Sequence, residues 1–183
     1  MATEVAQPAV NLIEMGRDLE TQELEAPGGV ATASIYGQLL AVYLYDNDMQ
    51  CKFLWKRIPA AVKNTNSELG HIWTVGQKMW QRDFTAIYES LKRDWSEAVK
   101  PIMVAVGEAT RKRAFHLISQ AYSSITAEAF AVYMGMSVSD AVQAAISEGW
   151  QADPQTRLVT PKRPVPPPDP KLMSEFSCKG NNV

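Results

Sequence analysis

The sequence predicts a mostly α-helical protein, with tetratricopeptide-like helical hairpins followed by a winged helix and a small β-sheet. Apolar residues recur at helical spacing through residues 33–93, with polar turns between the segments. Residues 112–160 then contain three short apolar-periodic segments, a strand led by Trp150, a turn and a second strand, which is the order of a winged helix. These observations divide the chain into segments 1–30, 31–110, 111–163 and 164–183.

Segment 1–30 contains one predicted helix, about residues 8–24, followed by a break. A partial apolar stripe supports the helix and consists of Leu12, Ile13, Met15 and Leu19. The run Ala26-Pro27-Gly28-Gly29 then combines the two residue types that most strongly interrupt a helix. We therefore expect the chain to turn before the next segment.

Segment 31–110 is predicted to consist of helical hairpins. The first hairpin has one helix before the polar turn 46–48 and another at about 49–57, ahead of Pro59. Residues 64–67 are a predicted loop with N-cap residues. Pro101 is expected to start or kink the last helix, which continues to Tyr122. The apolar faces of three helices are Ile35, Leu39, Val42 and Tyr43, then Leu69, Ile72, Trp73, Gly76 and Trp80, then Phe84, Ile87, Tyr88 and Leu91.

A faint internal repeat runs through this segment at an offset of 35 residues. The offset is close to the ~34-residue period of tetratricopeptide-like helix pairs, which stack because one pair cannot bury its apolar face alone. Two units are fewer than the ~3 usually needed, so another helix or another protein would complete the stack. The alternative is chance matching between apolar helices. The matched pairs are Leu44 with Met79, Tyr45 with Trp80, Asp48 with Asp83, Met49 with Phe84, and Phe53 with Tyr88.

Segment 111–163 contains the predicted winged helix. Its middle helix presents an apolar face and ends at Gly135, which readily takes the left-handed conformation. Ser137, with Asp140 three residues later, forms a capping box that opens the next helix, about residues 138–149. The wing is predicted as two strands joined by a turn, at residues 150–152, 153–156 and 157–159.

The helix in the recognition position favours protein binding over DNA binding. It contains no Lys or Arg, and its charged residues are Asp140 and Glu148. Phosphates attract cations, and base edges are read mainly by Arg, Lys, Asn or Gln, so Gln143 alone is insufficient. The alternative, a DNA-binding winged-helix regulator, would require salt-dependent DNA binding through some other surface.

The composition argues against several classes of protein. The chain has 183 residues with 20 acidic and 18 basic side chains, so its overall charge gives no case for nucleic acid. Cys51 and Cys178 have no paired spacing, which is typical of a reducing compartment. No apolar run approaches the ~20 residues of a membrane span, and the N-terminus lacks a secretory pattern. We expect a soluble intracellular protein.

No residue is predicted to be catalytic, to bind a cofactor or to hold a metal. His71 and His116 lack metal-ligand spacing, and no phosphate loop, dinucleotide fingerprint or nucleophile elbow occurs. A nucleophilic Cys51 is the enzymatic alternative, but no His partner is evident, and a small buried residue is the favoured interpretation. The basic cluster Arg111-Lys112-Arg113 is interpreted as a solvated helix face or a site for an acidic patch on a partner.

Several strings of residues occur in one order along the chain: QELEAPGG (22–29), YGQLLAVYL (36–44), LWKRIP (54–59), NSELG (66–70), WQRDF (80–84), RKRAFHLISQAY (111–122) and GWQAD (149–153). They resemble the PCI-domain family of scaffold subunits, which occurs in the proteasome lid, the signalosome and translation initiation factor three. The resemblance is most specific to the family of signalosome eighth subunits, and it covers roughly residues 20–163.

The resemblance implies a non-catalytic scaffold in a complex that removes a ubiquitin-like modifier from cullins, with the zinc site on a different subunit. It implies other PCI-type signalosome subunits as partners and a location in cytoplasm and nucleus. We expect no small-molecule substrate and no membrane partner, and the charges above disfavour nucleic acid. A subunit of the proteasome lid or of a translation initiation complex is the alternative within the class. The interface residues implied by analogy are on or near the wing: Trp150, Arg157, Leu158 and Val159.

The C-terminal part departs from this family pattern. Family members continue after a linker into an apolar helix that enters a bundle shared by the PCI subunits. Here segment 164–183 is Pro-rich and continues into SEFSCKGNNV, which has no helical apolar period. We expect this tail to be disordered, and the resemblance does not extend to bundle insertion.

Overall fold

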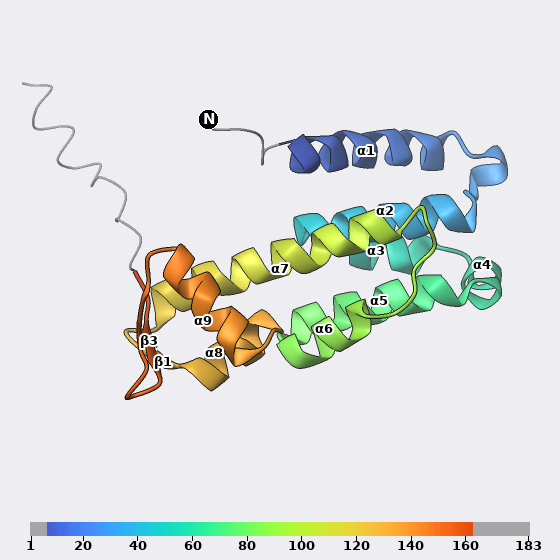
Figure 1. Ribbon diagram of the computed structural model, residues 1–183. Coiled ribbons are helices and arrows are strands. Elements are labelled where there is room, and N and C mark those ends of the chain that lie inside the picture. The colour runs from blue at the N-terminus through green and yellow to red at the C-terminus, as the bar shows by residue number, and fades with distance from the viewer. Residues whose placement is uncertain (1–6, 163–183) are drawn as a thin grey trace, which may run out of the picture.

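The computed structural model describes residues 7–162, and their side chains from residue 12 onward, as a mostly helical fold with one three-stranded sheet (Figure 1). The predicted disordered tail, 164–183, lies outside the described residues. The elements are α1 (Gln7–Leu24), η1 (Pro27–Gly29), α2 (Ala33–Asp46), α3 (Gln50–Arg57), α4 (Ala60–Thr65), α5 (Ser67–Gln81), α6 (Phe84–Leu91), α7 (Lys100–Ala121), β1 (Ile125–Thr126), α8 (Ala127–Met134), α9 (Val138–Ser147), β2 (Gln151–Asp153) and β3 (Leu158–Thr160).

The helix ends follow the local chemistry of the sequence. The Thr32 hydroxyl accepts a hydrogen bond from the Ile35 amide and caps α2, and the Asn66 side chain caps α5 through the Glu68 amide at 2.9 Å. Gly135 ends α8 at φ 64°, as its sequence position predicts. These caps satisfy backbone groups that a helix leaves unpaired at its ends.

Helix α4 was not predicted, and the predicted loop at 64–67 is wrong for most of its length. Only Asn66 leaves the helical conformation between α4 and α5. Pro59 sits extended at the N-cap of α4, a position close to the first helical turn that proline favours. The helix contains no buried residue, so no apolar stripe marks it in the sequence.

Helix α2 is the centre of the first hydrophobic core, in residues 12–106 of the described chain. It packs against α1, α3, α5 and α7, and its buried residues lie on nearly all sides. A helix with apolar residues on all sides is buried, because other helices pack against each of its faces. Burying each large aliphatic side chain contributes about 1.5–3 kcal/mol. The fully buried residues of this core include Leu39, Leu40, Leu54, Ile72 and Val106.

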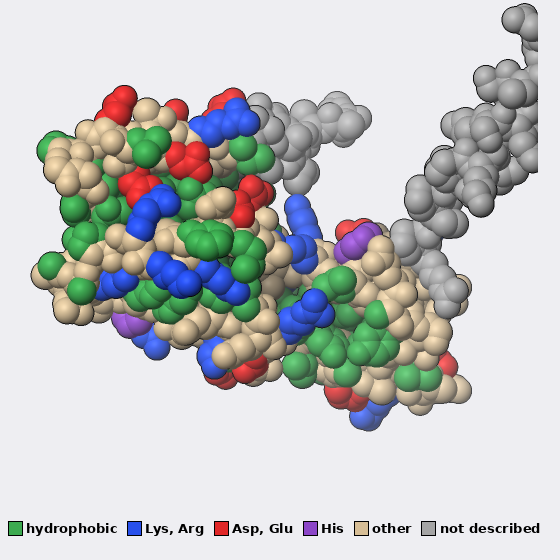
Figure 2. Space-filling view, turned by 180° about the vertical axis from the view of Figure 1, so that it is seen from behind, with side chains coloured by type: hydrophobic (Ala, Val, Ile, Leu, Met, Phe, Trp, Pro, Cys, Tyr) green, Lys and Arg blue, Asp and Glu red, His purple; other side chains and the backbone are tan. Residues whose placement is uncertain are grey.

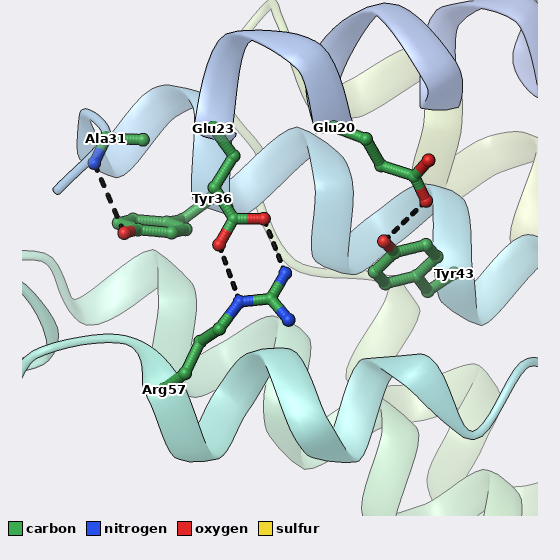
Figure 3. Close-up of polar contacts among 6 residues, drawn as sticks. All are labelled: Glu20, Glu23, Ala31, Tyr36, Tyr43 and Arg57. Carbon is green, nitrogen blue, oxygen red and sulfur yellow. Dashed lines mark hydrogen bonds and ion pairs between the residues drawn. The ribbon is translucent and has the colours of Figure 1, made fainter. Parts of the chain in front are cut away.

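Two polar contacts fasten α1 onto this core (Figure 3). The Arg57 guanidinium of α3 donates to both carboxylate oxygens of Glu23, at 2.7 and 2.5 Å. The Tyr43 hydroxyl of α2 donates to Glu20 at 2.7 Å, and burial together with the Glu20 carboxylate raises the pKa of Tyr43. The hydroxyl therefore keeps its proton at neutral pH. Leu19 is the one apolar side chain of α1 that is fully buried among the described residues.

A second hydrophobic core lies under the sheet, and α7 belongs to both cores. Ile102 and Met103 of α7 pack in the first core, whereas Phe115 and Ile118 pack in the second. The helix runs without interruption across the predicted segment boundary at 110/111, from the helical end of the molecule to the sheet (Figure 1). The division of the chain into domains stays a prediction. The second core also contains Ile125, Ala127, Phe130, Ala131, Met134, Ala141, Ala145, Trp150 and Val159.

The sheet has the order β1-β3-β2, with both pairs antiparallel. Val159 lies opposite Ile125 on one side and Ala152 on the other. The two wing strands begin one residue later than predicted, because Trp150 precedes β2 and Arg157 closes the turn at φ 55°. Strand β1 could not be predicted from the sequence, because two residues are too few to show an alternation of apolar and polar side chains.

Within residues 7–162, no single helix is long and apolar enough to cross a membrane. The pair α8 and α9 reaches that length and apolarity only when joined across an 89° bend.

Candidate protein interface

The turn of the wing is held by its own side chains. The Asp153 carboxylate accepts hydrogen bonds from the Gln155 amide at 2.9 Å and from the Thr156 hydroxyl at 2.8 Å. These bonds stabilise the carboxylate and hold the pKa of Asp153 below its usual range. Arg157 and Glu128 form an exposed ion pair at 3.4 Å, which ties the wing to α8 but stabilises little in water.

The structure does not bring the four predicted interface side chains onto one surface. Trp150 is buried, with its ring centroid 4.0 Å from that of Phe115 and 5.4 Å from that of Phe130. Val159 is 1% exposed and lies in the same core. Both are core residues because the chain folds back onto α7 after α9. Arg157 and the half-buried Leu158 are left to present side chains outward, and their contact with a partner stays a prediction.

Strand-edge pairing through residues 157–159 is not available in this topology. Strand β3 is central and is hydrogen-bonded on both sides. Within the described chain, the free edges belong to the outer strands β1 and β2. Gln151 and Asp153 of β2 have exposed side chains, whereas β1 has only two residues. The edge that another chain could extend is therefore β2.

Helix α9 presents a neutral to acidic surface. Asp140 and Glu148 are exposed, and α9 contains no Lys or Arg. Ser137 caps the helix through the Asp140 amide at 3.2 Å and donates its hydroxyl to the Asp140 carboxylate at 2.6 Å, so the capping contact is confirmed. Val138 and Ile146 are apolar side chains that are 42% and 55% exposed. Such a surface repels phosphates and offers apolar contact instead.

Two of the three cations in the Arg111-Lys112-Arg113 cluster hold the fold together, so interpreting the cluster as a solvated face was wrong for them. Arg111 donates to the Met134 carbonyl at 3.1 Å, which joins α7 to α8. Arg113 donates to the Tyr45 carbonyl at 3.2 Å, which joins α7 to α2, and burial lowers its pKa. Lys112 is the exposed member.

A cleft of about 580 Å³ lies between α7 and α9, beside Arg111 and Lys112. The charged residues that line it are of both signs: Arg111, Lys112 and Lys162 are cationic, and Glu148 is anionic. His116 is exposed and contacts the Gln120 side chain at 2.9 Å. Among the described residues, no three His, Cys, Asp or Glu side chains gather where they could hold a metal.

Cys51 does not have the environment of a nucleophile. Its side chain is fully buried in the first core, and burial raises the pKa of the thiol to about 12. A thiol is nucleophilic only as the thiolate, so Cys51 is unreactive at neutral pH. The interpretation as a buried helix residue is confirmed.

The architecture defines the class: a mostly helical protein in which two hydrophobic cores share helix α7 and a three-stranded antiparallel sheet follows the helices. The model of the CSN8/PSMD8/EIF3K family matches residues 30–169, and the chain belongs to this family. The chain is similar to "COP9 signalosome complex subunit 8" of Xenopus tropicalis, with 56% identity over 162 residues that cover 87% of this chain and 84% of the relative.

The same similarity extends to distant organisms. The protein of that name from Danio rerio is 55% identical over 151 residues, covering 81% of this chain and 79% of the relative. The one from Arabidopsis thaliana is 35% identical over 126 residues, covering 68% and 64%. The resemblance drawn from the sequence strings is confirmed.

Proposed function

We propose that this chain is a non-catalytic scaffold subunit of the signalosome complex that deneddylates cullin-RING ubiquitin ligases. One observation carries the proposal: 56% identity to a subunit of that name over 87% of the chain. The buried Cys51, whose thiol pKa is raised by burial, supports a role in binding over thiol chemistry. With that role, we expect the chain in the cytoplasm and the nucleus, together with the complex.

The segment from β1 to β3 acts as a winged helix that joins sister PCI subunits. Its order of strand, two helices and two strands, with α7 before it, supports this interpretation. The extendable edge of β2 is the natural point for strand pairing with a neighbouring subunit, while the acidic α9 disfavours DNA. Arg157 and Leu158 lie beside that edge on the wing.

The helical part acts as a short stack of related hairpins. Asn47 and Arg82 both end their helices in the left-handed conformation, at φ 57° in each case, and they are separated by the repeat offset of 35 residues. Asp83 caps α6 by accepting a hydrogen bond from the Ala86 amide, and Asp48, one residue before the N-cap of α3, accepts one from the Gln50 amide. A left-handed residue followed by an aspartate at the same offset in both corners supports a repeat over chance matching of apolar residues.

Affinity purification of the tagged chain from cells, with mass spectrometry of what co-purifies, tests the proposal. We expect other signalosome subunits in near-equal amounts. Recovery of proteasome-lid or initiation-factor subunits instead would move the chain to another branch of its family. Gln151→Lys places a charge on the β2 edge and should lower the recovery of sister subunits severalfold, because edge lysines block strand addition.

Gln155→Lys is the matched control, since it makes the same chemical change in the exposed wing turn, off the edge. Both variants should keep wild-type helix content. Equal recovery with the two variants would remove the β2 edge from the interface.

A further inference from the structure

The face formed by α3, α4 and α5 carries a ladder of tryptophan rings and lysines, here called the Trp–Lys surface. The rings of Trp55 and Trp73 stack at 5.0 Å, and Trp80 meets Trp73 edge to face at 5.1 Å. The Lys63 ammonium lies 4.8 Å from the centre of the Trp55 ring, and the Lys52 ammonium lies 4.3 Å from that of Trp80. All five side chains are partly exposed.

This surface is basic in a chain that is acidic overall. Residues 49–82 contain six Lys or Arg and one Glu, whereas the whole chain has a net charge of −2. The Glu68 carboxylate in this stretch is engaged by the amide and hydroxyl of Ser96. In Figure 2, Lys and Arg side chains form a band among hydrophobic ones, while Asp and Glu gather above the band. An anionic partner would be attracted here.

The surface also has hydrogen-bond donors without protein acceptors. The Trp95 indole N–H donates to the Leu91 carbonyl at 3.1 Å. Within the described chain, the indole N–H groups of Trp55, Trp73 and Trp80 have no such partner, and no buried side-chain polar atom is left unsatisfied, so these groups are open to solvent. Indole N–H groups and ammonium groups donate and never accept. The complementary surface is therefore rich in acceptors.

The ring geometry distinguishes between two kinds of anion. Nucleobases bind single-strand proteins by stacking on open aromatic faces. Here one face of Trp55 is covered by Trp73 and the other by Lys63. The edges of the rings carry partial positive charge and remain available to contact carboxylates and carbonyls. We propose that the Trp–Lys surface docks an acidic segment of a partner protein, with carboxylates on Lys52 and Lys63 and acceptors on the indoles.

The test uses the full chain and a short fluorescein-labelled peptide in which Asp and Glu alternate with Leu and Phe. We expect saturable binding by fluorescence anisotropy, with quenching of tryptophan emission. Replacing every Asp and Glu of the peptide by Asn and Gln should abolish binding. Lys52→Glu with Lys63→Glu should weaken binding about tenfold, because each attraction becomes a repulsion.

Lys92→Glu with Lys100→Glu is the matched control, because both lysines are exposed and lie outside the surface. This control should change affinity by less than about twofold, since exposed charges at a distance are screened by salt. Lys52→Gln with Lys63→Gln repeats the test without charge reversal, and thermal unfolding verifies the fold of every variant.

Three results would overturn the proposal: no binding of the acidic peptide, equal binding by the Lys52/Lys63 variants, or tighter binding of oligouridylate through the same lysines. The last result would make the surface a nucleic-acid site. These three results are independent of the purification experiment above, because the Trp–Lys surface lies on α3–α5 and not on the sheet.

Discussion

At the scale of single residues, Gly135 meets two separate structural requirements. It ends α8 with φ 64°, where side chains are strained. The ring of Tyr88 also lies against it so closely that a Cβ would come within 2.2 Å of Tyr88 Cδ2. That ring is fixed by its hydroxyl, which donates to the Tyr133 carbonyl at 3.0 Å, and by Arg111, 5.3 Å from the ring centre. The first requirement is visible in the sequence, whereas the second depends on a distant helix.

Gly135→Ala should destabilise the protein by about 2–4 kcal/mol, from left-handed strain and from overpacking against the ring. Urea unfolding followed by circular dichroism measures the change. Gly28→Ala is the control, because Gly28 has φ +70° but no atom within 4 Å of the added Cβ. That control should cost only about 1–2 kcal/mol. If the two variants lost the same stability, the contact with Tyr88 would have no energetic role.

At the scale of elements, the helices that carry an apolar stripe or a cap could be predicted from the sequence, and those without one could not. Gly135 and Ser137 marked the corner between α8 and α9 correctly. Helix α4 buries nothing, and β1 is two residues long, so neither leaves a periodic pattern. The missed β1 had the larger consequence. It turned β3 from a presumed edge into the central strand, and so moved the candidate interface to β2.

Among its described side chains, helix α1 is held to the first core by two polar contacts and by the buried Leu19 (Figure 3). Glu23→Ala should remove the bidentate contact with Arg57 at a cost of about 1–2 kcal/mol, reduced because water reaches the exposed guanidinium. Hydrogen exchange in α1 should accelerate while α2 stays protected. Glu25→Ala, at an exposed position, is the control, and it should change neither the stability nor the rate of hydrogen exchange in α1. Uniform acceleration in both helices would show that α1 does not open by itself.

At the scale of the whole molecule, the two hydrophobic cores are connected through a shared helix and through contacts between helices. Helix α7 contributes side chains to both, and α6 contacts α8 through Tyr88 and Gly135. The ring of Phe84 also meets that of Tyr133 at 5.3 Å across the same junction. Sequence periodicity assigned most core residues correctly within each helix. It could not show that Trp150 is enclosed by Phe115 and Phe130, because burial at that position depends on how three segments meet.

This continuity predicts that the described part of the chain unfolds as one cooperative unit. Phe130→Ala removes a fully buried ring from the second core and should destabilise the protein by about 3–5 kcal/mol. If the cores are coupled, α2 in the first core and α8 in the second will lose protection at the same urea concentration, in this variant and in the wild type. Pulse hydrogen exchange with mass spectrometry across a urea series measures both midpoints. Leu40→Ala, from the fully buried first core, is the reciprocal variant and should shift both midpoints together as well. Loss of α8 protection in Phe130→Ala while α2 stays protected would show instead that the segment from β1 to β3 is an independent folding unit, with α7 frayed beyond the first core.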